Sequence, residues 1–200
     1  MSVKFTRMSQ FIAAAEDWLR SNTPVPEEQG NALARIGRYL AQSGTNESTL
    51  IITLAGAPGT GKSTLAKACC AGFEADRHSA MVLSLDDYYF PAEHRKLLAR
   101  TEHPLFGVRG VPGTHDMDLV IDHVHQLLDP QHAEIQMPRF DKSSDDRMPA
   151  SRTIPAGFVP DLLIIEGWVA GAPPQAGGSL LSPVNKLAAI DDEDGEWRAR

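Results

Sequence analysis

The sequence predicts an α/β fold in which a parallel β-sheet carries helices on both faces and is preceded by two N-terminal helices. A short apolar run rich in β-branched residues predicts a buried strand at residues 50–55, and further short strands are predicted at residues 80–85, 134–137 and 162–165. Helix patterns lie between them, most clearly at residues 117–128. Strands that alternate with helices pair in parallel through right-handed crossovers. A glycine-rich segment directly after the first strand is the third observation, because such a segment opens a helix in nucleotide-binding α/β proteins.

The two N-terminal helices are predicted from apolar residues that recur at intervals of three and four. The first stripe runs from Phe5 to Leu19, and the segment Thr23 to Pro26 interrupts it. The second stripe is Leu33, Ile36 and Leu40, and Gly44 supplies a stop. We expect residues 1–48 to form a helical extension that packs on the core, and the main domain to occupy residues 49–200.

Composition narrows the class of protein. Of the 200 residues, 42% are hydrophobic and 22% are charged, which is typical of a globular domain. The net charge of −7 speaks against a nucleic-acid-binding surface and favours a small-molecule partner. Cys69 and Cys70, the only cysteines, are adjacent, so they predict neither a disulfide framework nor a zinc site. With no signal-peptide pattern and no apolar stretch of membrane-spanning length, we expect a cytoplasmic protein without a membrane partner; the oligomeric state stays open.

The glycine-rich segment matches the phosphate-binding pattern G-x-x-x-x-G-K-[ST], between a strand and a helix. Its backbone N–H groups and the following helix N-terminus suit a phosphate anion. Lys62 is expected to reach the β and γ phosphates, and the Ser63 hydroxyl to bind Mg²⁺, which prefers hard oxygen ligands. The predicted ligands are ATP and Mg²⁺, and the binding residues are Gly56, Ala57, Pro58, Gly59, Thr60, Gly61, Lys62, Ser63 and Thr64.

A GTPase is a weaker interpretation of the same loop. Asn185 and Lys186 resemble the beginning of the guanine-reading N-K-x-D element, but Ala188 stands where the aspartate would be.

Acidic residues follow two of the predicted strands. Asp86 and Asp87 come after the second strand, where a carboxylate can accept a substrate proton or hold Mg²⁺ through water, although turns also favour aspartate. Glu166 ends the apolar run of residues 162–165, which is the usual setting of a Walker-B-type acid. We therefore predict a metal or water-network role for Glu166 together with Ser63.

Residues 50 to 170 resemble the P-loop kinases of the uridine kinase, phosphoribulokinase and pantothenate kinase superfamily, which implies a kinase-type P-loop fold. Asp86 to Tyr89 is similar to the D-x-F-Y segment of that family, whose first aspartate is the catalytic base, and this role carries over to Asp86. Three more segments look like the P-G-T-H-D, P-R-[YF]-D-K-S and E-G-W motifs of D-glycerate 3-kinases, namely residues 112–116, 138–143 and 166–168.

A glycerate-like acceptor has a carboxylate and hydroxyls, and such groups require cations and polar side chains. Arg139 and Lys142 are candidates for the carboxylate, and His115 and Asp116 for the hydroxyls. Two alternatives stay open: Arg139 could pair with Asp141, and His115 could cap the next helix. Arg147 and Arg152 are interpreted as solvent-facing. The full predicted acceptor set is Asp87, Tyr89, His115, Asp116, Arg139, Asp141 and Lys142.

Two long segments, residues 91–113 and 138–160, show no regular pattern, and we expect them to be loops around the substrate because both follow strands. The resemblance also has departures. Ala57 and Pro58 replace a glutamine that is usual in glycerate kinases. The family continues beyond the Asn185 region with a strand and an arginine-bearing lid helix, and no such pattern precedes Arg200, so the kinase domain is expected to be incomplete at its C-terminal end.

The expected reaction is transfer of the γ-phosphoryl group of ATP to a hydroxyl of a small metabolite, with D-glycerate as the first choice. Asp86 would act as the base, and Lys62 would stabilise charge on the phosphates. The alternatives are a nucleoside or pantothenate kinase, or a truncated ATP-binding paralogue that transfers no phosphate.

Overall fold

The computed structural model describes residues 8–22, 36, 48–180, 182–183 and 185–199. The chain divides into two compact units, which are described separately. We call them the phosphate-loop unit (Met1–Leu85, Val124–Ile135 and Ile154–Gly171) and the hairpin unit (Asp86–His123, Gln136–Thr153 and Ala172–Arg200).

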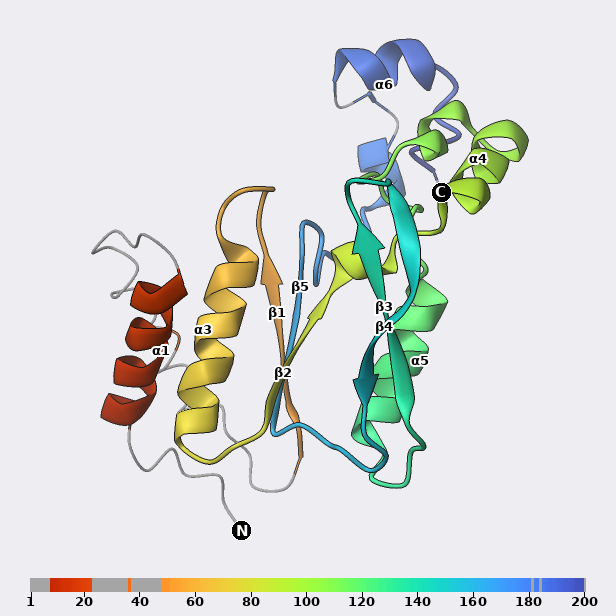
Figure 1. The fold of residues 1–200 in the computed structure, drawn as a ribbon. Helices are drawn as coiled ribbons and strands as arrows, with labels where there is room; N and C mark the ends of the chain where they lie inside the picture. Colours follow the sequence, from red (N-terminus) through yellow and green to blue (C-terminus); the bar gives the residue numbers. More distant parts are fainter. Residues whose placement is uncertain (1–7, 23–35, 37–47, 181, 184, 200) are drawn as a thin grey trace. The chain divides into compact units, whose positions relative to one another are not determined.

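The phosphate-loop unit is built on a parallel sheet of three strands in the order β1-β5-β2 (Figure 1). Its strands are β1 (Leu50–Ala55), β2 (Ala80–Ser84) and β5 (Leu162–Gly167). Consecutive residues of the central strand, Leu163 and Ile164, are both buried. Successive side chains of a strand point to opposite faces, so both faces of β5 are covered. The predicted α/β fold with a parallel sheet flanked by helices is thus confirmed.

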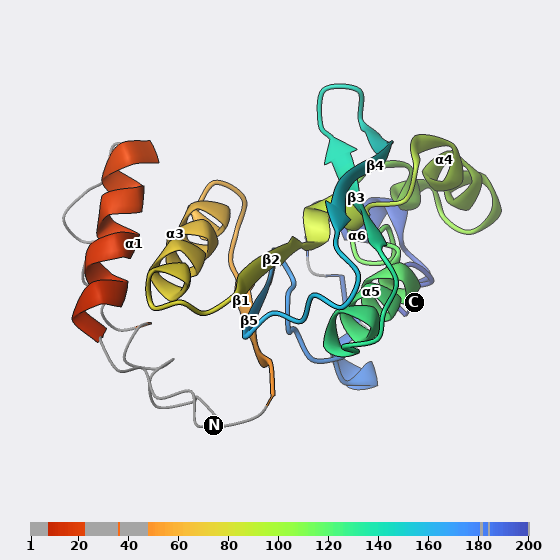
Figure 2. The same cartoon turned by 60° about the horizontal axis from the view of Figure 1, so that its bottom comes forward.

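Two helices pack beside this sheet: α3 (Lys62–Ala75) contacts all three strands, and α1 (Met8–Asn22) packs against α3 (Figure 2). The rings of Phe11 and Phe73 meet edge to face with centroids 6.5 Å apart. The helices approach closely at Gly72, where a Cβ atom would lie 2.6 Å from the Phe11 ring. The first predicted N-terminal helix is therefore present from Met8 onward, and it packs on the core.

Most of the second predicted helix lies outside the described residues, as do Phe5 and the segment from Thr23 to Pro26. Of that helix only Ile36 is described; it is helical, and it packs against the core of the phosphate-loop unit. The domain boundary between residues 48 and 49 stays a prediction.

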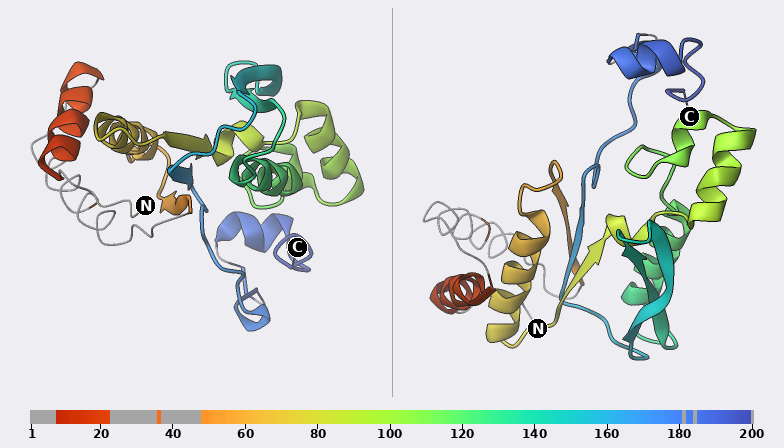
Figure 3. Two further views of the ribbon diagram at one scale, coloured as in Figure 1. Left: turned by 90° about the horizontal axis from the view of Figure 1, so that it is seen from below. Right: turned by 45° about the horizontal axis from the view of Figure 1, so that its top comes forward.

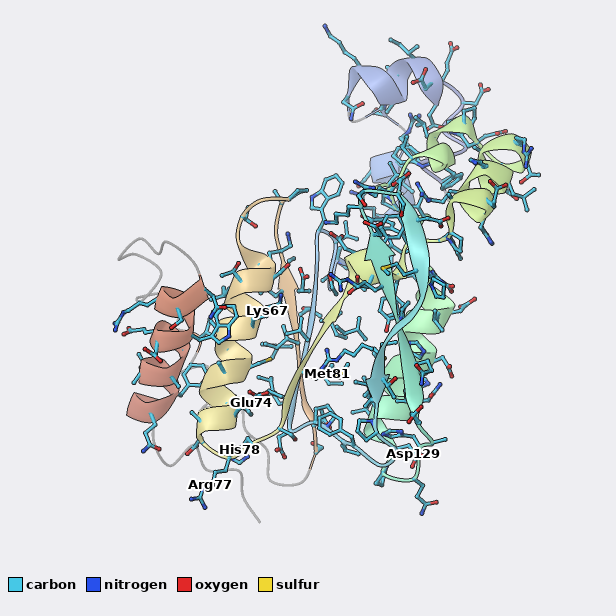
Figure 4. The ribbon with its side chains drawn as sticks, viewed as in Figure 1. Lys67, Glu74, Arg77, His78, Met81 and Asp129 are labelled. Carbon is cyan, nitrogen blue, oxygen red and sulfur yellow. The ribbon has the colours of Figure 1, made fainter. Side chains whose placement is uncertain are left out.

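Side-chain hydrogen bonds tie the beginnings of β2 and β5 together. The turn after α3 passes through Arg77 and His78 to Ser79 (Figure 4). The Ser79 N–H and hydroxyl donate to one carboxylate oxygen of Asp161, at 2.7 and 2.9 Å. This link fixes the register in which Ala80 pairs with Leu162 and, at the opposite ends of the strands, Ser84 pairs with Glu166.

The hairpin unit contains most of two strands, β3 (Ile135–Asp141) and β4 (Asp146–Ile154), which form a separate two-stranded sheet (Figure 3). A four-residue connection can join only antiparallel neighbours, so the pair is a hairpin. The strand predicted at residues 134–137 is real, but its place in the parallel sheet is wrong. The loop predicted at residues 138–160 is also wrong, because it holds the rest of β3 and all of β4.

The other predicted loop, residues 91–113, contains α4 (Ala92–Thr101) and η2 (Pro104–Gly107). The residue that α4 buries is Arg95, with a relative exposure of 1%. A helix that buries an arginine shows no apolar stripe, which explains why the pattern was missed. The same unit holds η1 (Leu85–Tyr88) from Asp86 onward and the first half of α5 (Met117–Leu128), the latter with the predicted bounds.

The described C-terminal residues of the hairpin unit include η3 (Gly177–Leu180) and α6 (Lys186–Asp191). Asn185 is the N-cap of α6, and its side chain accepts a hydrogen bond of 2.9 Å from the Ala188 N–H. The Asn-Lys pair is therefore explained by helix capping, which leaves the GTPase interpretation without support.

Candidate active site

The phosphate loop, residues 56–61, joins β1 to α3. Gly59 and Gly61 have φ angles of 80° and 83°, which other residues rarely adopt. The Thr60 hydroxyl and the Lys62 ammonium both donate to the Ala57 carbonyl, at 2.8 and 2.9 Å. The loop is therefore curled, with Lys62 folded over it at the positive end of α3. A bound phosphate would compete with one neutral carbonyl for this lysine.

Glu166 lies at the end of β5 and is 4% exposed. One oxygen of its carboxylate accepts hydrogen bonds from the hydroxyls of Ser63, at 2.9 Å, and Ser84, at 2.6 Å. Buried carboxylates require such partners. The predicted pair of Ser63 and Glu166 is thus brought into direct contact, at the first turn of α3.

This arrangement fits Mg²⁺. The Ser63 hydroxyl and the Glu166 carboxylate are hard oxygen ligands that lie side by side. Within the described part of the chain, no cluster of three or more His, Cys, Asp or Glu residues is placed to hold a metal ion. Mg²⁺ is usually held by few protein ligands together with waters and substrate phosphates. Sequence reasoning missed Ser84, whose only signal was its position at the end of β2.

In the hairpin unit, the two adjacent aspartates have different surroundings. Asp86 forms an ion pair with Lys142, with 2.7 Å between Nζ and Oδ2. Asp87 accepts a hydrogen bond of 3.1 Å from the Phe140 N–H, which links η1 to β3. Asp86 therefore presents its carboxylate to another side chain, whereas Asp87 has a structural contact.

Two rings stand near Asp86. Tyr89 stacks on His115 with ring centroids 4.1 Å apart, and the same residues form an antiparallel backbone bridge. Burial raises the pKa of Tyr89 to about 12, and the Asp86 charge adds to the shift. Burial lowers the pKa of His115, partly opposed by Asp86. At neutral pH both rings are thus held in their uncharged forms, which can exchange hydrogen bonds with hydroxyls.

The backbone conformation of the two residues before His115 is tightly restricted. Gly113 has a φ angle of 86°, and a Cβ atom there would lie 2.6 Å from the Phe106 ring. The buried Thr114 donates its hydroxyl to the Val111 carbonyl at 2.6 Å. The Gly-Thr part of the P-G-T-H-D segment therefore has a structural role that presents His115.

Arg147 contradicts its predicted solvent-facing position. Its guanidinium donates to the carbonyls of Tyr89 and Tyr88, at 2.9 and 3.0 Å, and to one carboxylate oxygen of Asp116, at 3.1 Å. The other oxygen of Asp116 accepts from the Leu119 N–H at the start of α5. Asp116, rather than His115, is thus the residue that caps this helix. Arg147 positions the ends of η1 and α5, and an acceptor contact by Asp116 stays a prediction.

The tip of the hairpin is held by two aspartates. Asp141 accepts hydrogen bonds from Ser143 N–H, Ser143 Oγ and Ser144 Oγ, and these bonds lower its pKa to about 2. Asp145 pairs with Arg95 and Arg109, whose guanidiniums both lie 5.6 Å from the centre of the Phe140 ring.

The two predicted cations of the acceptor set are placed differently. Among the described residues no ion pair joins Arg139 to Asp141, and the Arg139 side chain is exposed. Lys142 is engaged with Asp86. The hairpin unit thus brings together Asp86, Tyr89, His115 and Lys142. The roles of all these residues stay predictions.

The parallel sheet and the phosphate loop between β1 and α3 define a nucleotide-binding α/β fold, and solved structures of kinases share this fold. The chain superposes on the solved YGR205w protein with a TM-score of 0.61 and 24% identity, over 95% of this chain and 63% of that one. It superposes on D-glycerate 3-kinase from Cryptococcus neoformans with a TM-score of 0.58 and 22% identity, over 86% and 56% of the two chains. The superposition on a possible uridine kinase from Bacillus stearothermophilus has a TM-score of 0.54 and 18% identity, and it covers 70% of this chain and 71% of that one. The chain has the fold of P-loop kinases.

Two proteins that are similar to this chain in sequence are also kinases. An uncharacterized kinase of Schizosaccharomyces pombe, mug58, is 31% identical over 131 residues, which are 62% of this chain and 47% of that protein. The chloroplastic D-glycerate 3-kinase of Arabidopsis thaliana is 28% identical over 161 residues, 76% of this chain and 34% of that protein. No protein-family model matches the chain. The predicted resemblance to kinases, including D-glycerate 3-kinase, is confirmed by these relatives.

The chain covers 47% and 34% of the length of these two curated relatives, less than half of each. No helix among the described residues is long and apolar enough to cross a membrane.

Proposed function

We propose that the protein is an ATP-dependent kinase that transfers the γ-phosphoryl group to a hydroxyl of a small carboxylate-bearing metabolite, with D-glycerate as the best candidate. The observation that carries the kinase proposal is the contact between Ser63, at the end of the phosphate loop, and the buried Glu166. Any buried carboxylate needs hydrogen-bond partners. What supports nucleotide chemistry is that one partner of Glu166 is Ser63, the residue whose hydroxyl binds Mg²⁺ in the G-x-x-x-x-G-K-[ST] pattern.

The phosphates of ATP would lie against the N–H groups of residues 56–63, at the positive end of α3. Lys62 would leave the Ala57 carbonyl and bind the β and γ phosphates. Bound Mg²⁺, held by Ser63 and Glu166, would neutralise charge on the phosphates. Ser84 would keep the Glu166 carboxylate oriented while Ser63 changes partner.

Asp86 is the proposed proton acceptor for the attacking hydroxyl. Its neighbour Asp87 is the weaker candidate, because Asp87 already accepts the Phe140 N–H. His115 and Tyr89 are proposed to hydrogen-bond acceptor hydroxyls, since both are uncharged at neutral pH. Lys142 and the exposed Arg139 would bind the carboxylate.

D-glycerate is the first choice because a sequence relative and a solved structure with the same fold are D-glycerate 3-kinases. A nucleoside or pantothenate kinase would share Lys62 and Asp86 and would need other acceptor contacts. A truncated paralogue that binds ATP alone is the third candidate. We also propose a cytoplasmic location, because Cys69 and Cys70, the only cysteines, are adjacent and fit a reducing compartment.

The test is acceptor-dependent ADP release with D-glycerate, uridine and pantothenate, by the chain together with any residues that continue it. We expect release with D-glycerate only. ADP release with uridine alone would mean that the acceptor is a nucleoside and not D-glycerate. ATP binding without ADP release for any acceptor would favour the truncated paralogue that transfers no phosphate.

A further inference from the structure

We propose that Lys142 is a latch on Asp86 that an acceptor carboxylate opens, so that the base is released only when an anionic acceptor binds. This inference rests on the proposed function and adds a specificity mechanism to it. The observation is the ion pair itself, with the Lys142 ammonium 2.7 Å from the Asp86 carboxylate. A carboxylate that is to accept a proton has to be free of that ammonium.

The backbone on either side of Lys142 is fixed. On one side the Asp141 carboxylate is bound by Ser143 and Ser144, and on the other Asp145 is bound by Arg95 and Arg109. Arg95 is itself buried and also donates to the Phe90 carbonyl at 3.1 Å. These contacts hold the backbone at Lys142 in place within the hairpin unit.

The Lys142 side chain, in contrast, can change its conformation. It is 61% exposed, and Asp86 is 38% exposed, so their ion pair is of the weak surface kind. A lysine carries a compact charge on a flexible stem, and rotation about its side-chain bonds moves the ammonium without moving the hairpin. The exchange of one carboxylate partner for another is therefore inexpensive.

Only an anion can make this exchange. A neutral hydroxyl compound has no charge with which to draw the ammonium from Asp86, whereas the carboxylate of a hydroxy acid does. Tyr89, whose side chain hydrogen-bonds Asp86, and His115 are both uncharged, so neither supplies the positive charge that Lys142 gives to a carboxylate. The latch thus favours hydroxy acids over uncharged polyols at the step where the base is released.

The latch makes an unusual prediction: removal of the proposed catalytic charge should improve acceptor binding, because Asp86 and the acceptor compete for one lysine. Binding of D-glycerate and of glycerol is measured by calorimetry for the wild type, Asp86→Asn, Lys142→Met and the double variant. We expect Asp86→Asn to tighten D-glycerate binding about two- to fivefold, the range of a surface ion pair. Lys142→Met should weaken it about tenfold or more, as should the double variant.

Lys96 provides a matched control, because it forms an exposed ion pair of 2.7 Å with Glu93 in the same unit. Glu93→Gln and Lys96→Met should leave D-glycerate binding unchanged. Glycerol has no carboxylate that competes with Asp86 for Lys142, so glycerol binding should show no tightening in Asp86→Asn. A merely structural role for Lys142 would not tighten binding in Asp86→Asn.

Unchanged or weaker D-glycerate binding in Asp86→Asn would overturn the latch and leave the proposed acceptor in place. Tightening that persists in the double variant would also overturn it, since the gain must act through Lys142. If the wild type binds no D-glycerate but releases ADP with uridine, both the latch and the proposed acceptor fail, and the kinase activity stands.

Discussion

The two units of the chain differ in how they hold their polar groups. In the phosphate-loop unit a few polar atoms lie at the ends of aliphatic elements. The register of β2 and β5 places the Ser84 hydroxyl at Glu166, and the first turn of α3 supplies the Ser63 hydroxyl. In the hairpin unit ion pairs join segments far apart in the sequence, such as Arg147 with Asp116 and Lys142 with Asp86, the proposed base. Backbone geometry therefore positions the polar groups around Glu166, whereas ion pairs between side chains position those of the hairpin unit.

The largest expected effect separates chemistry from nucleotide binding. Asp86→Asn should lower turnover about 10²- to 10⁴-fold, the usual loss when a general base is removed, with ATP affinity nearly unchanged. Asp87→Asn should lose less, because Asp87 bonds the Phe140 N–H. ADP release and ATP titration measure the two quantities. An active Asp86 variant beside an inactive Asp87 variant would reverse the assignment.

The next effect tests whether buried charge supports the hairpin unit. Arg95→Met should lower the free energy of unfolding by about 2–3 kcal/mol, since hydrogen bonds to Asp145 and the Phe90 carbonyl are lost. Lys96→Met, on the exposed side of the same helix, should change it by less than about 0.5 kcal/mol. Urea denaturation measures both. Equal effects of the two substitutions would show that the Arg95 contacts do not stabilise the hairpin unit.

A smaller effect concerns the acceptor. Arg139→Ala should raise the KM for D-glycerate about tenfold to a hundredfold and leave the KM for ATP unchanged, because a guanidinium on the acceptor carboxylate acts on that substrate alone. Arg152→Ala is the matched control on the neighbouring strand β4. Steady-state kinetics with unchanged glycerate parameters would make Arg139 an ordinary surface residue.

The same contrast explains what the sequence could predict. The strand at residues 50–55, the helix at residues 117–128 and the phosphate loop follow from local patterns of apolar residues and glycine. Strand β4 has a proline, Pro149, within it, and α4 buries Arg95, so neither shows such a pattern. The local signal fails where charged residues take the place of the apolar core.

The candidate site divides in the same way. Ser63 and Glu166 were predicted together because each follows a recognisable element, and their side chains are in contact. Arg147 was missed because no local feature distinguishes a guanidinium bound to two carbonyls from one in solvent. Its partners lie about 30 and 60 residues away in the chain, as the separations of 31 and 59 show.

The central claim, that residues 56–63 bind ATP with Mg²⁺, is tested most directly by thermal denaturation with and without the ligand. At one hundred times the dissociation constant, ligand binding stabilises the folded state by about 2.7 kcal/mol, or roughly 5–10 °C for a chain of this size. We expect this shift in the wild type and in Lys67→Ala, a control at an exposed lysine of α3 (Figure 4). Lys62→Ala should lose most of it. A full shift in Lys62→Ala, or none in the wild type, would contradict the assignment of this loop.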